Sequence, residues 1–305
     1  MDKSCSLVLG NDQMTGRMIV YDLNKIPENG ALEDGEIWSF PSGHAAGVKL
    51  RENTVFGDVL LIGGSVGYMV SYPSGEVLWS TNDPGNNTHS VEILPGGNLL
   101  LANSTGNDIR LFFTSALLTG DKEKAATYVS YPFRCTHGLL YDPVYECLWV
   151  IGEWELAAYR IVGEGVDQRI EPMEGKTYSL EPFGNAGHDL SPDLFDSRYL
   201  YCTPARGALR FDKETGTFDQ SFSEGTRLQT YSYRSFTQMP DGSFVYTSSS
   251  PEGRRNQFEG WWKGSWCTDY IGVVRPQPDG SRKEFRYYSD KLAFYKARAF
   301  CGRYL

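Results

Sequence analysis

The chain of 305 residues lacks the features of two large protein classes. No apolar run approaches the roughly 18 residues that span a membrane, so no membrane partner is predicted. Positive charge is scarce, because 29 Lys and Arg stand against 38 Asp and Glu and give a net charge of −9. Phosphate binding needs a basic surface, and the sequence therefore disfavours a nucleic-acid partner.

Two further features are missing. The N-terminal sequence MDKSCSLVLGND has no hydrophobic signal core, which predicts either a cytoplasmic protein or a secreted one whose leader was removed. The six cysteines form no CxxC pair and no zinc spacing, so we expect single buried thiols and no thiolate metal site. The sequence leaves the oligomeric state open.

Sustained helical periodicity is also absent, and residues 112–126 offer one helical turn at most. In its place the chain has 19 Tyr, 16 Phe and 33 Gly. Many aromatic residues together with many glycines favour short strands joined by tight turns.

A strand–turn–strand pattern recurs along these strands. HSVEILPGGNLLLA, from His89, and RSFTQMPDGSFVYT, from Arg234, share Ser, Pro and Gly at matching positions. The outline returns from His137 and His188, and more loosely from Val48. The starts lie roughly 45 to 50 residues apart, which is the length of one four-stranded propeller blade.

Both ends of the chain hold strands that these five repeats leave over. SLVLGND, RMIVYDL and EIWSF precede the first repeat, and YKARAF follows the last. Because ring closure removes exposed strand edges, the sequence predicts an all-β fold, a six-bladed β-propeller. One domain then covers residues 1–305, and its last blade takes strands from both termini. A two-sheet β-sandwich, the alternative, does not explain the repeat phase.

The four histidines are placed unevenly in this scheme. The innermost strand of each blade lines the central channel, so a residue repeated at the start of that strand is repeated around the axis. His89, His137 and His188 share that phase in successive blades, whereas His44 lies a few residues upstream of the corresponding strand. We therefore expect the three imidazoles to face one point near the axis.

In the other blades, cationic residues occupy the equivalent position at the start of the innermost strand. Arg234 holds it in the fifth repeat, Lys49 is the candidate in the first, and Lys296 or Arg298 in the last. Two acidic groups lie close by in sequence. We expect Glu92, three positions from His89, to be structural, and Asp189 either to accept from a cation of the channel or to cap a turn.

Three interpretations of these axial residues remain open. Three neutral imidazoles could hold a divalent metal (Mn, Zn, Fe or Ca) that polarises a carboxylate or activates water. Without a metal, His, Arg and Lys together suit a carboxylate, phosphate or sulfate ligand, and a desolvated imidazole can act as acid or base. In the third interpretation the histidines only fill the channel.

An insertion in the fifth repeat, residues 251–270, is rich in tryptophan. It holds Trp261, Trp262 and Trp266 among glycines and basic residues. A loop of this kind can lie over the channel mouth and offer flat apolar surfaces to sugar rings. Packing between blades or against a partner subunit is the alternative.

Several segments resemble a known family. NTHSVEILPGGNLLLANSTGN, THGLLYDPVYECLWVIGEWELAAYRI, GHDLSPDLFDSRYLYCTP and the closing YKARAF are similar to a widespread propeller family, domain of unknown function 6528, over roughly residues 7–300. The family implies the fold and the histidine positions, but no reaction. Its members often have an acidic residue where this chain has Ala46-Gly47-Val48 before Lys49, and His44 is the candidate to replace it. The channel is more loosely similar to that of propeller polysaccharide lyases of the oligogalacturonate lyase type, which use a metal held by histidines.

The leading functional prediction is an enzyme that acts on an acidic or polyhydroxylated small molecule, with a uronate-containing saccharide favoured. The reaction is lyase- or hydrolase-like. The histidines at 89, 137 and 188 hold a divalent metal or supply the acid and base, and Arg234, Lys49 and Arg298 bind the carboxylate. No serine or cysteine triad is apparent. The alternative is a non-catalytic propeller that binds a ligand or a protein on its top face.

Overall fold

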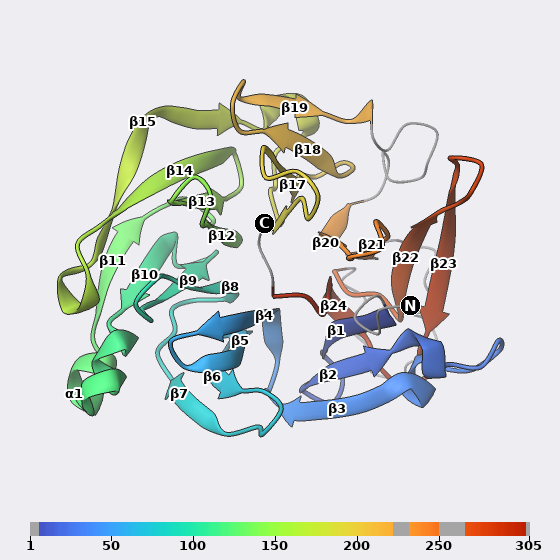
Figure 1. Ribbon diagram of the computed structural model, residues 1–305, viewed down its shortest axis with the longest axis horizontal. Coiled ribbons are helices and arrows are strands. Elements are labelled where there is room, and N and C mark those ends of the chain that lie inside the picture. The colour runs from blue at the N-terminus through green and yellow to red at the C-terminus, as the bar shows by residue number, and fades with distance from the viewer. Residues whose placement is uncertain (1–5, 222–231, 250–265, 303–305) are drawn as a thin grey trace.

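Six four-stranded antiparallel sheets surround a common axis in the computed structural model, which describes residues 6–221, 232–249 and 266–302 (Figure 1). This confirms the predicted six-bladed β-propeller. We number blades one to five along the chain and call the sixth the closing blade. No helix within the described ranges is long and apolar enough to cross a membrane.

In blade one the four strands follow one another from the axis outward, and the other blades share this arrangement. Blade one contains β4 (Ala45–Thr54), β5 (Gly57–Gly64), β6 (Gly67–Ser71) and β7 (Val77–Thr81). Blade two contains β8 (Thr88–Ile93), β9 (Leu99–Asn103), β10 (Asp108–Phe112) and β11 (Tyr128–Pro132). Blade three contains β12 (Gly138–Asp142), β13 (Cys147–Ile151), β14 (Glu155–Val162) and β15 (Arg169–Ser179).

The remaining blades repeat this order. Blade four contains β16 (Asp189–Pro192), β17 (Tyr199–Thr203), β18 (Leu209–Asp212) and β19 (Thr217–Asp219). Blade five contains β20 (Tyr233–Gln238), β21 (Phe244–Ser248), β22 (Tyr270–Pro276) and β23 (Arg282–Tyr288). The closing blade contains β24 (Phe294–Ala299), β1 (Leu7–Asp12), β2 (Arg17–Asp22) and β3 (Glu36–Pro41).

The closing blade joins the two ends of the described chain. Leu9 of β1 lies opposite Arg298 of β24, and the backbone N–H of Phe300 donates to the Leu7 carbonyl at 3.0 Å. Figure 1 shows the dark-blue β1 beside the red β24. The predicted closure by strands from both termini is therefore confirmed, and it leaves no innermost strand without a partner in its own blade.

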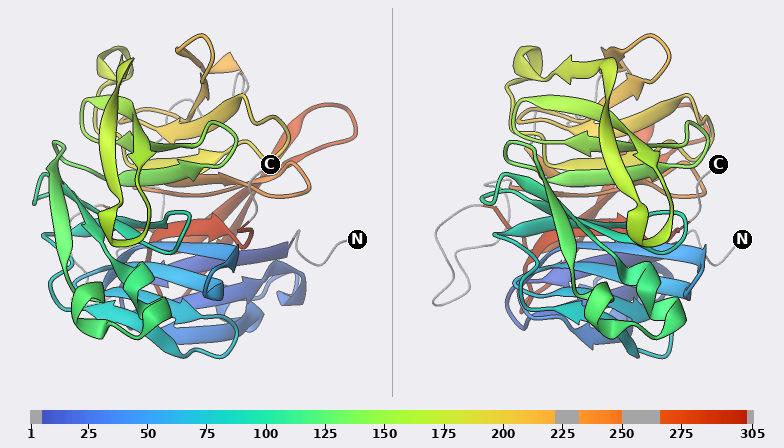
Figure 2. Two further views of the ribbon diagram at one scale, coloured as in Figure 1. Left: turned by 60° about the vertical axis from the view of Figure 1, so that its left-hand side comes forward. Right: turned by 90° about the vertical axis from the view of Figure 1, so that its left-hand side faces the viewer.

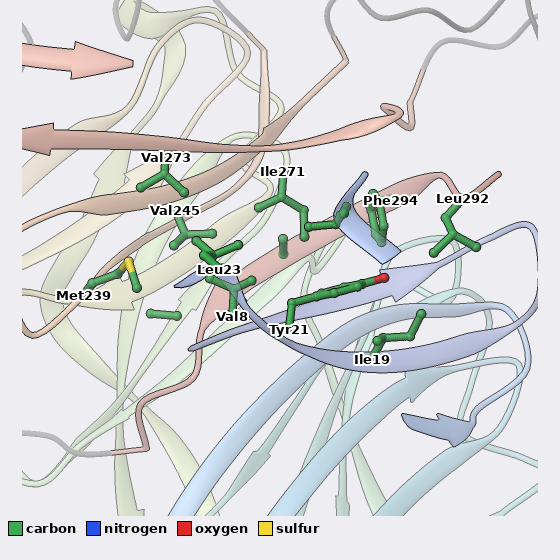
Figure 3. Packing of buried hydrophobic residues seen from close by; sticks show 13 residues of the cluster. Val8, Ile19, Tyr21, Leu23, Met239, Val245, Ile271, Val273, Leu292 and Phe294 are labelled. Carbon is green, nitrogen blue, oxygen red and sulfur yellow. The ribbon is translucent and has the colours of Figure 1, made fainter. Parts of the chain in front are cut away.

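Apolar side chains fill the space between neighbouring blades. Val8, Ile19 and Tyr21 of the closing blade pack with Val245 and Ile271 of blade five, all fully buried (Figure 3). Such packing follows from the strand sequences, because alternate residues of each strand face the next blade. These interblade clusters hold the innermost strands at fixed positions around the axis.

Short helical turns occupy a few connections. They are η2 (Leu23–Lys25), η3 (Leu32–Gly35), η4 (Thr114–Thr119), α1 (Lys122–Ala125), η5 (Gly165–Asp167) and η6 (Glu181–Phe183). The η4–α1 pair confirms the helical turn expected in residues 112–126, and Figure 2 shows it on the outer rim of the ring.

The cysteines of the described chain are all free thiols. Cys147, Cys202 and Cys267 are buried, as expected of single thiols, whereas Cys135 and Cys301 are half-buried. Burial raises the pKa of the Cys202 thiol above its usual range, which keeps it protonated and unreactive.

Candidate functional site

The start of each innermost strand contributes one residue to the end of the channel. In β12 and β16 the preceding histidine continues the pairing: the backbone N–H of His137 donates to Ile151 at 2.9 Å, and that of His188 to Thr203 at 2.8 Å. In β8 and β20 the register shifts across His89 and Arg234. The same kind of shift falls on Ala46 in β4 and next to Tyr295 in β24. The six residues that share this position are Ala46, His89, His137, His188, Arg234 and Tyr295.

These six residues line one cavity of about 510 Å³ at the end of the channel. Its size falls within the range of pockets for small-molecule ligands, about 300 to 1,000 Å³. The other described residues that line it are Gln13, His44, Gly64, Ser65, Asn87 and Trp266. No Asp or Glu belongs to the described lining, so its only side chain with a fixed charge is the guanidinium of Arg234.

The three imidazoles lie side by side along the wall of this cavity. The ring centroids of His89 and His137 are 4.2 Å apart, and those of His137 and His188 are 4.9 Å apart. The Tyr295 ring continues the row on the far side of His89, at a centroid distance of 5.3 Å. The structure thus brings together the three histidines that the repeat phase placed at the axis.

Hydrogen bonds distinguish the three imidazoles. The Nδ1 atoms of His137 and His188 lie next to backbone carbonyls of Cys135 and Ala186, and a carbonyl only accepts, so each Nδ1 carries the proton. The Nε2 atom of each ring is then an acceptor. Both ring nitrogens of His89 are buried and have no hydrogen-bond partner among the described residues.

Burial keeps these imidazoles neutral. It lowers the pKa of His137 to about 4, with nearby Lys296 and Arg234 adding to the effect. Burial, followed by the charge of Arg234, holds the pKa of His188 well below 6.5, and the pKa of His89 is lowered in the same direction. At neutral pH all three rings are therefore uncharged and can accept a hydrogen bond, as Nε2 of His188 does from Arg234.

Arg234 differs from the other cations near the axis. Its Nη1 donates to Nε2 of His188, which matches the proton position assigned to that ring. Its Nε is buried and has no partner among the described residues, and no described carboxylate lies within ion-pair distance. The charge of Arg234 is therefore uncompensated within the described part of the site.

Lys296 lies directly beneath the histidines and not in the cavity. Its fully buried ammonium donates to the His188 carbonyl at 2.8 Å and to the His89 carbonyl at 3.3 Å. It also pairs with the buried Asp189 at 3.2 Å, and Arg298 pairs with the same carboxylate. Of the two roles expected for Asp189, the structure shows acceptance from the channel cations.

Lys49 occupies a still lower layer. It pairs with Glu92 at 3.1 Å, and the Arg51 guanidinium donates two hydrogen bonds of 2.7 Å to the same carboxylate. Burial alone would raise the pKa of Glu92, but the two cations outweigh it and lower that pKa to about 2. The arrangement agrees with a structural role for Glu92.

The expectation that Lys49, Lys296 and Arg298 bind a ligand is therefore not supported. None of them lines the cavity, and each is buried with a carboxylate partner. Bulges near the start of β4 and β24 shift the register, and a shift of one residue changes the face on which a side chain lies. The cavity positions of these blades belong to Ala46 and Tyr295, and the sequence analysis missed Tyr295.

The remaining predicted residues are His44, which the structure describes, and Trp261 and Trp262, which it does not. His44 is exposed and lines the cavity over blade one, and its role in ligand binding stays a prediction. Trp261 and Trp262 lie outside the described residues. Trp266, from the same insertion, lines the cavity and keeps 44% of its surface exposed.

A metal shared by the three histidines does not fit the placed donors. Within the described ranges no group of three or more His, Cys, Asp or Glu is arranged to hold a metal ion. The Nε2 of His188 accepts from a guanidinium, and the rings of His89 and His137 are tilted by 38° to each other.

Comparison with solved structures places the chain among β-propellers. A protein of unknown function from Bacteroides caccae matches with a TM-score of 0.58 at 11% identity, over 96% of this chain and 97% of that one. A chain of the nidogen–laminin complex matches with a TM-score of 0.58 at 12% identity, over 98% and 99%. Virginiamycin B lyase from Staphylococcus aureus matches with a TM-score of 0.50 at 10% identity, over 93% and 85%.

These likenesses establish the fold alone, because every identity is far below 25%. They include an enzyme and a protein–protein complex. The chain spans 56% of the length of dihydro-heme d1 dehydrogenase NirN, which it matches with a TM-score of only 0.49. No family model matches the chain, and no curated protein matches it, so the resemblance to domain of unknown function 6528 stays a prediction.

Proposed function

We propose that this β-propeller binds a small carboxylate-bearing, hydroxylated molecule in the channel-end cavity and acts on it by acid–base chemistry. A saccharide that contains a uronate is the favoured class. The observation that carries the proposal is Arg234, a cation at a cavity whose described lining holds no carboxylate. A guanidinium without an anionic partner is costly in a partly desolvated site, and a bound carboxylate reduces that cost.

His188 has a positioning role in this proposal. Its Nδ1–H is fixed by the Ala186 carbonyl, and its Nε2 accepts from Arg234. Both nitrogens are thus engaged, so His188 orients the guanidinium and has no free lone pair with which to remove a proton from a ligand.

His137 is the better candidate for the base. Its Nδ1–H donates to the Cys135 carbonyl at 2.8 Å, which leaves the Nε2 lone pair for a ligand. A bound anion beside it would raise its pKa from about 4 toward neutrality, which strengthens it as a base.

A lyase reaction fits these groups better than hydrolysis does. Glycoside hydrolysis ordinarily needs two carboxylates, and the described lining has none. In elimination, Arg234 neutralises the uronate carboxylate and so acidifies the proton on C5. His137 Nε2 takes that proton, the C–H electrons form the C4–C5 double bond, and the C4–O bond breaks. The departing oxygen takes a proton from the Tyr295 phenol, and the proton on His137 then returns to the Tyr295 phenolate through solvent, which restores both groups.

The proposal is tested by calorimetric titration with D-glucuronate and D-glucose, which differ in the carboxylate. Wild type should bind glucuronate and not glucose, and Arg234→Ala should weaken glucuronate binding about 10- to 100-fold, a loss expected for a desolvated charge contact. His137→Ala should leave binding within a few-fold but abolish the ultraviolet absorbance of the unsaturated product formed from an O4-substituted glucuronate. Arg160→Ala, which removes an exposed arginine of β14, is the matched control.

A second candidate function rests on the close contact of the three tilted rings, which also suits a non-catalytic binding propeller. Glucuronate binding that depends on Arg234, without any unsaturated product, would favour this candidate. Absence of binding in wild type, or binding unchanged by Arg234→Ala, would contradict the proposal itself.

A further inference from the structure

The cavity is not symmetric about the propeller axis. Blades three and four each contribute one side chain to its described lining, His137 and His188. Blade one contributes four residues: His44, Ala46, Gly64 and Ser65. The cavity therefore extends from the axis outward over blade one.

Small residues account for this direction. Ala46 is the only small residue among the six equivalent positions around the channel. Gly64 is next to it in the sheet, and a Cβ there would lie 2.6 Å from the His44 carbonyl oxygen, so no side chain fits. Ser65 follows in the exposed turn between β5 and β6. Blade one thus leaves space where the other blades present imidazole, guanidinium or phenol groups.

The two halves of the cavity also differ in charge. The only side chain of fixed charge in the described lining is Arg234, of blade five. The half over blade one holds amide, hydroxyl and imidazole groups from Gln13, Ser65 and His44, and Asn87 lies at its border with blade two. Such groups form hydrogen bonds with hydroxyl and amide groups but offer no fixed charge to a second carboxylate.

We infer that the ligand is elongated, with one acidic end at Arg234 and an uncharged, hydroxyl- or amide-bearing body over blade one. The inference rests on the proposed function, because it takes Arg234 as the carboxylate site. It narrows the substrate class to molecules with a single terminal acid. A chain in which every sugar is a uronate would place its second carboxylate beside groups without a fixed positive charge, where it gains no ion pair.

The test compares three probes: glucuronate, glucose linked to O4 of glucuronate, and glucuronate linked to O4 of glucuronate. We expect the mono-acid disaccharide to bind at least about tenfold more tightly than either other probe. Ser65→Tyr, which fills the space over blade one, should weaken the mono-acid disaccharide about tenfold and leave glucuronate within about twofold. Ala46→Leu lies beside the axial residues and should weaken both. Ser80→Tyr, an equally exposed serine on the outer strand β7, should change neither.

Ser65 lies in an exposed turn, so its variant should fold even if Ala46→Leu does not. Equal binding of the two disaccharides, or equal weakening of glucuronate and disaccharide by Ser65→Tyr, would overturn this inference while Arg234 remains the carboxylate site. If wild type bound none of the three probes, the proposed function would be overturned, and this inference with it.

Discussion

Two layers of the channel lie one residue apart along the same strands and behave in opposite ways. His188 faces the cavity, whereas the next residue, Asp189, is fully buried and pairs with Lys296. Tyr295 and Lys296 differ in the same manner on β24. The cavity layer holds a cation without a described carboxylate, and the buried layer holds cations with one. An arginine occurs in both layers, Arg234 in the cavity and Arg298 in the buried layer, so the partner decides the role.

The buried layer needs its partners because water does not reach it. An ammonium or guanidinium taken out of water costs several kcal/mol unless a nearby anion and hydrogen bonds replace its hydration. Asp189 supplies that anion to both Lys296 and Arg298. Arg234 is half-buried at the cavity, where a ligand can supply the anion.

The largest loss of stability is expected when the Asp189 carboxylate, which Lys296 and Arg298 share, is removed. Asp189→Asn leaves two buried cations without their anion, and we expect it to lower the free energy of unfolding by about 3–5 kcal/mol. Urea denaturation measures this loss. Glu174→Gln, which removes an exposed carboxylate on β15, should change the same quantity by less than about 0.5 kcal/mol. A loss below about 1 kcal/mol for Asp189→Asn would show that the buried ion pairs are not what stabilises this layer.

Acid should separate the cavity layer from the lower layer of Lys49 and Glu92 in a smaller, graded way. The folded-state pKa values of the three imidazoles lie below 6.5, with His137 at about 4. Between these values the unfolded chain binds more protons than the folded one, so stability falls as pH falls from 6.5 toward 4. The Glu92 contribution follows at lower pH, because its pKa of about 2 lies below the usual 4.5 and stability is lost as pH falls through that range.

Melting temperature as a function of pH checks this order. His89→Gln should flatten the first stage, by at most ~1.4 kcal/mol per pH unit for the one proton removed. It should leave the second stage in place. A first stage that is unchanged in His89→Gln would mean that this imidazole is not held neutral in the folded chain.

The smallest effect on stability should come from the cavity cation. Arg234→Gln should change the free energy of unfolding by less than about 1 kcal/mol, because the described contacts of Arg234 include no ion pair. Arg234→Gln and Asp189→Asn together compare the two layers directly, because each variant removes one charged group from one layer. A loss as large as that of Asp189→Asn would place Arg234 with the buried cations.

The repeat explains why the fold could be predicted. Ser marks the innermost strand, and Pro and Gly mark the turn after it, in blades two and five. The histidines mark the strand starts of three successive blades. Each blade is a local unit, so the pattern can be read without knowing which residues meet across the ring. The leftover strands at the two ends then required one closing blade.

The candidate site could be predicted only where the repeat is regular. HSVEI of blade two aligns with AGVKL of blade one when Val is matched with Val, which places Ala46 opposite His89 and Lys49 opposite Glu92. That alignment was the available signal for Ala46. YKARA of β24 has no such match, and the register shift in β24 prevents the sequence from showing that Tyr295 faces the cavity. The pairing of Lys296 with Asp189 joins residues of different blades, and no local pattern records it.

The position of Lys296 also sets an order of assembly. Its ammonium contacts backbone carbonyls of blades two, three and four from a strand that comes after all of them along the chain. During synthesis these contacts form only once β24 has emerged, and they are among the most distant in sequence, which makes them late events in folding. The floor beneath the imidazoles and the closed ring therefore arise in the same step. A partly folded intermediate that lacks β24 would have no finished pocket, so ligand binding would report completion of the fold.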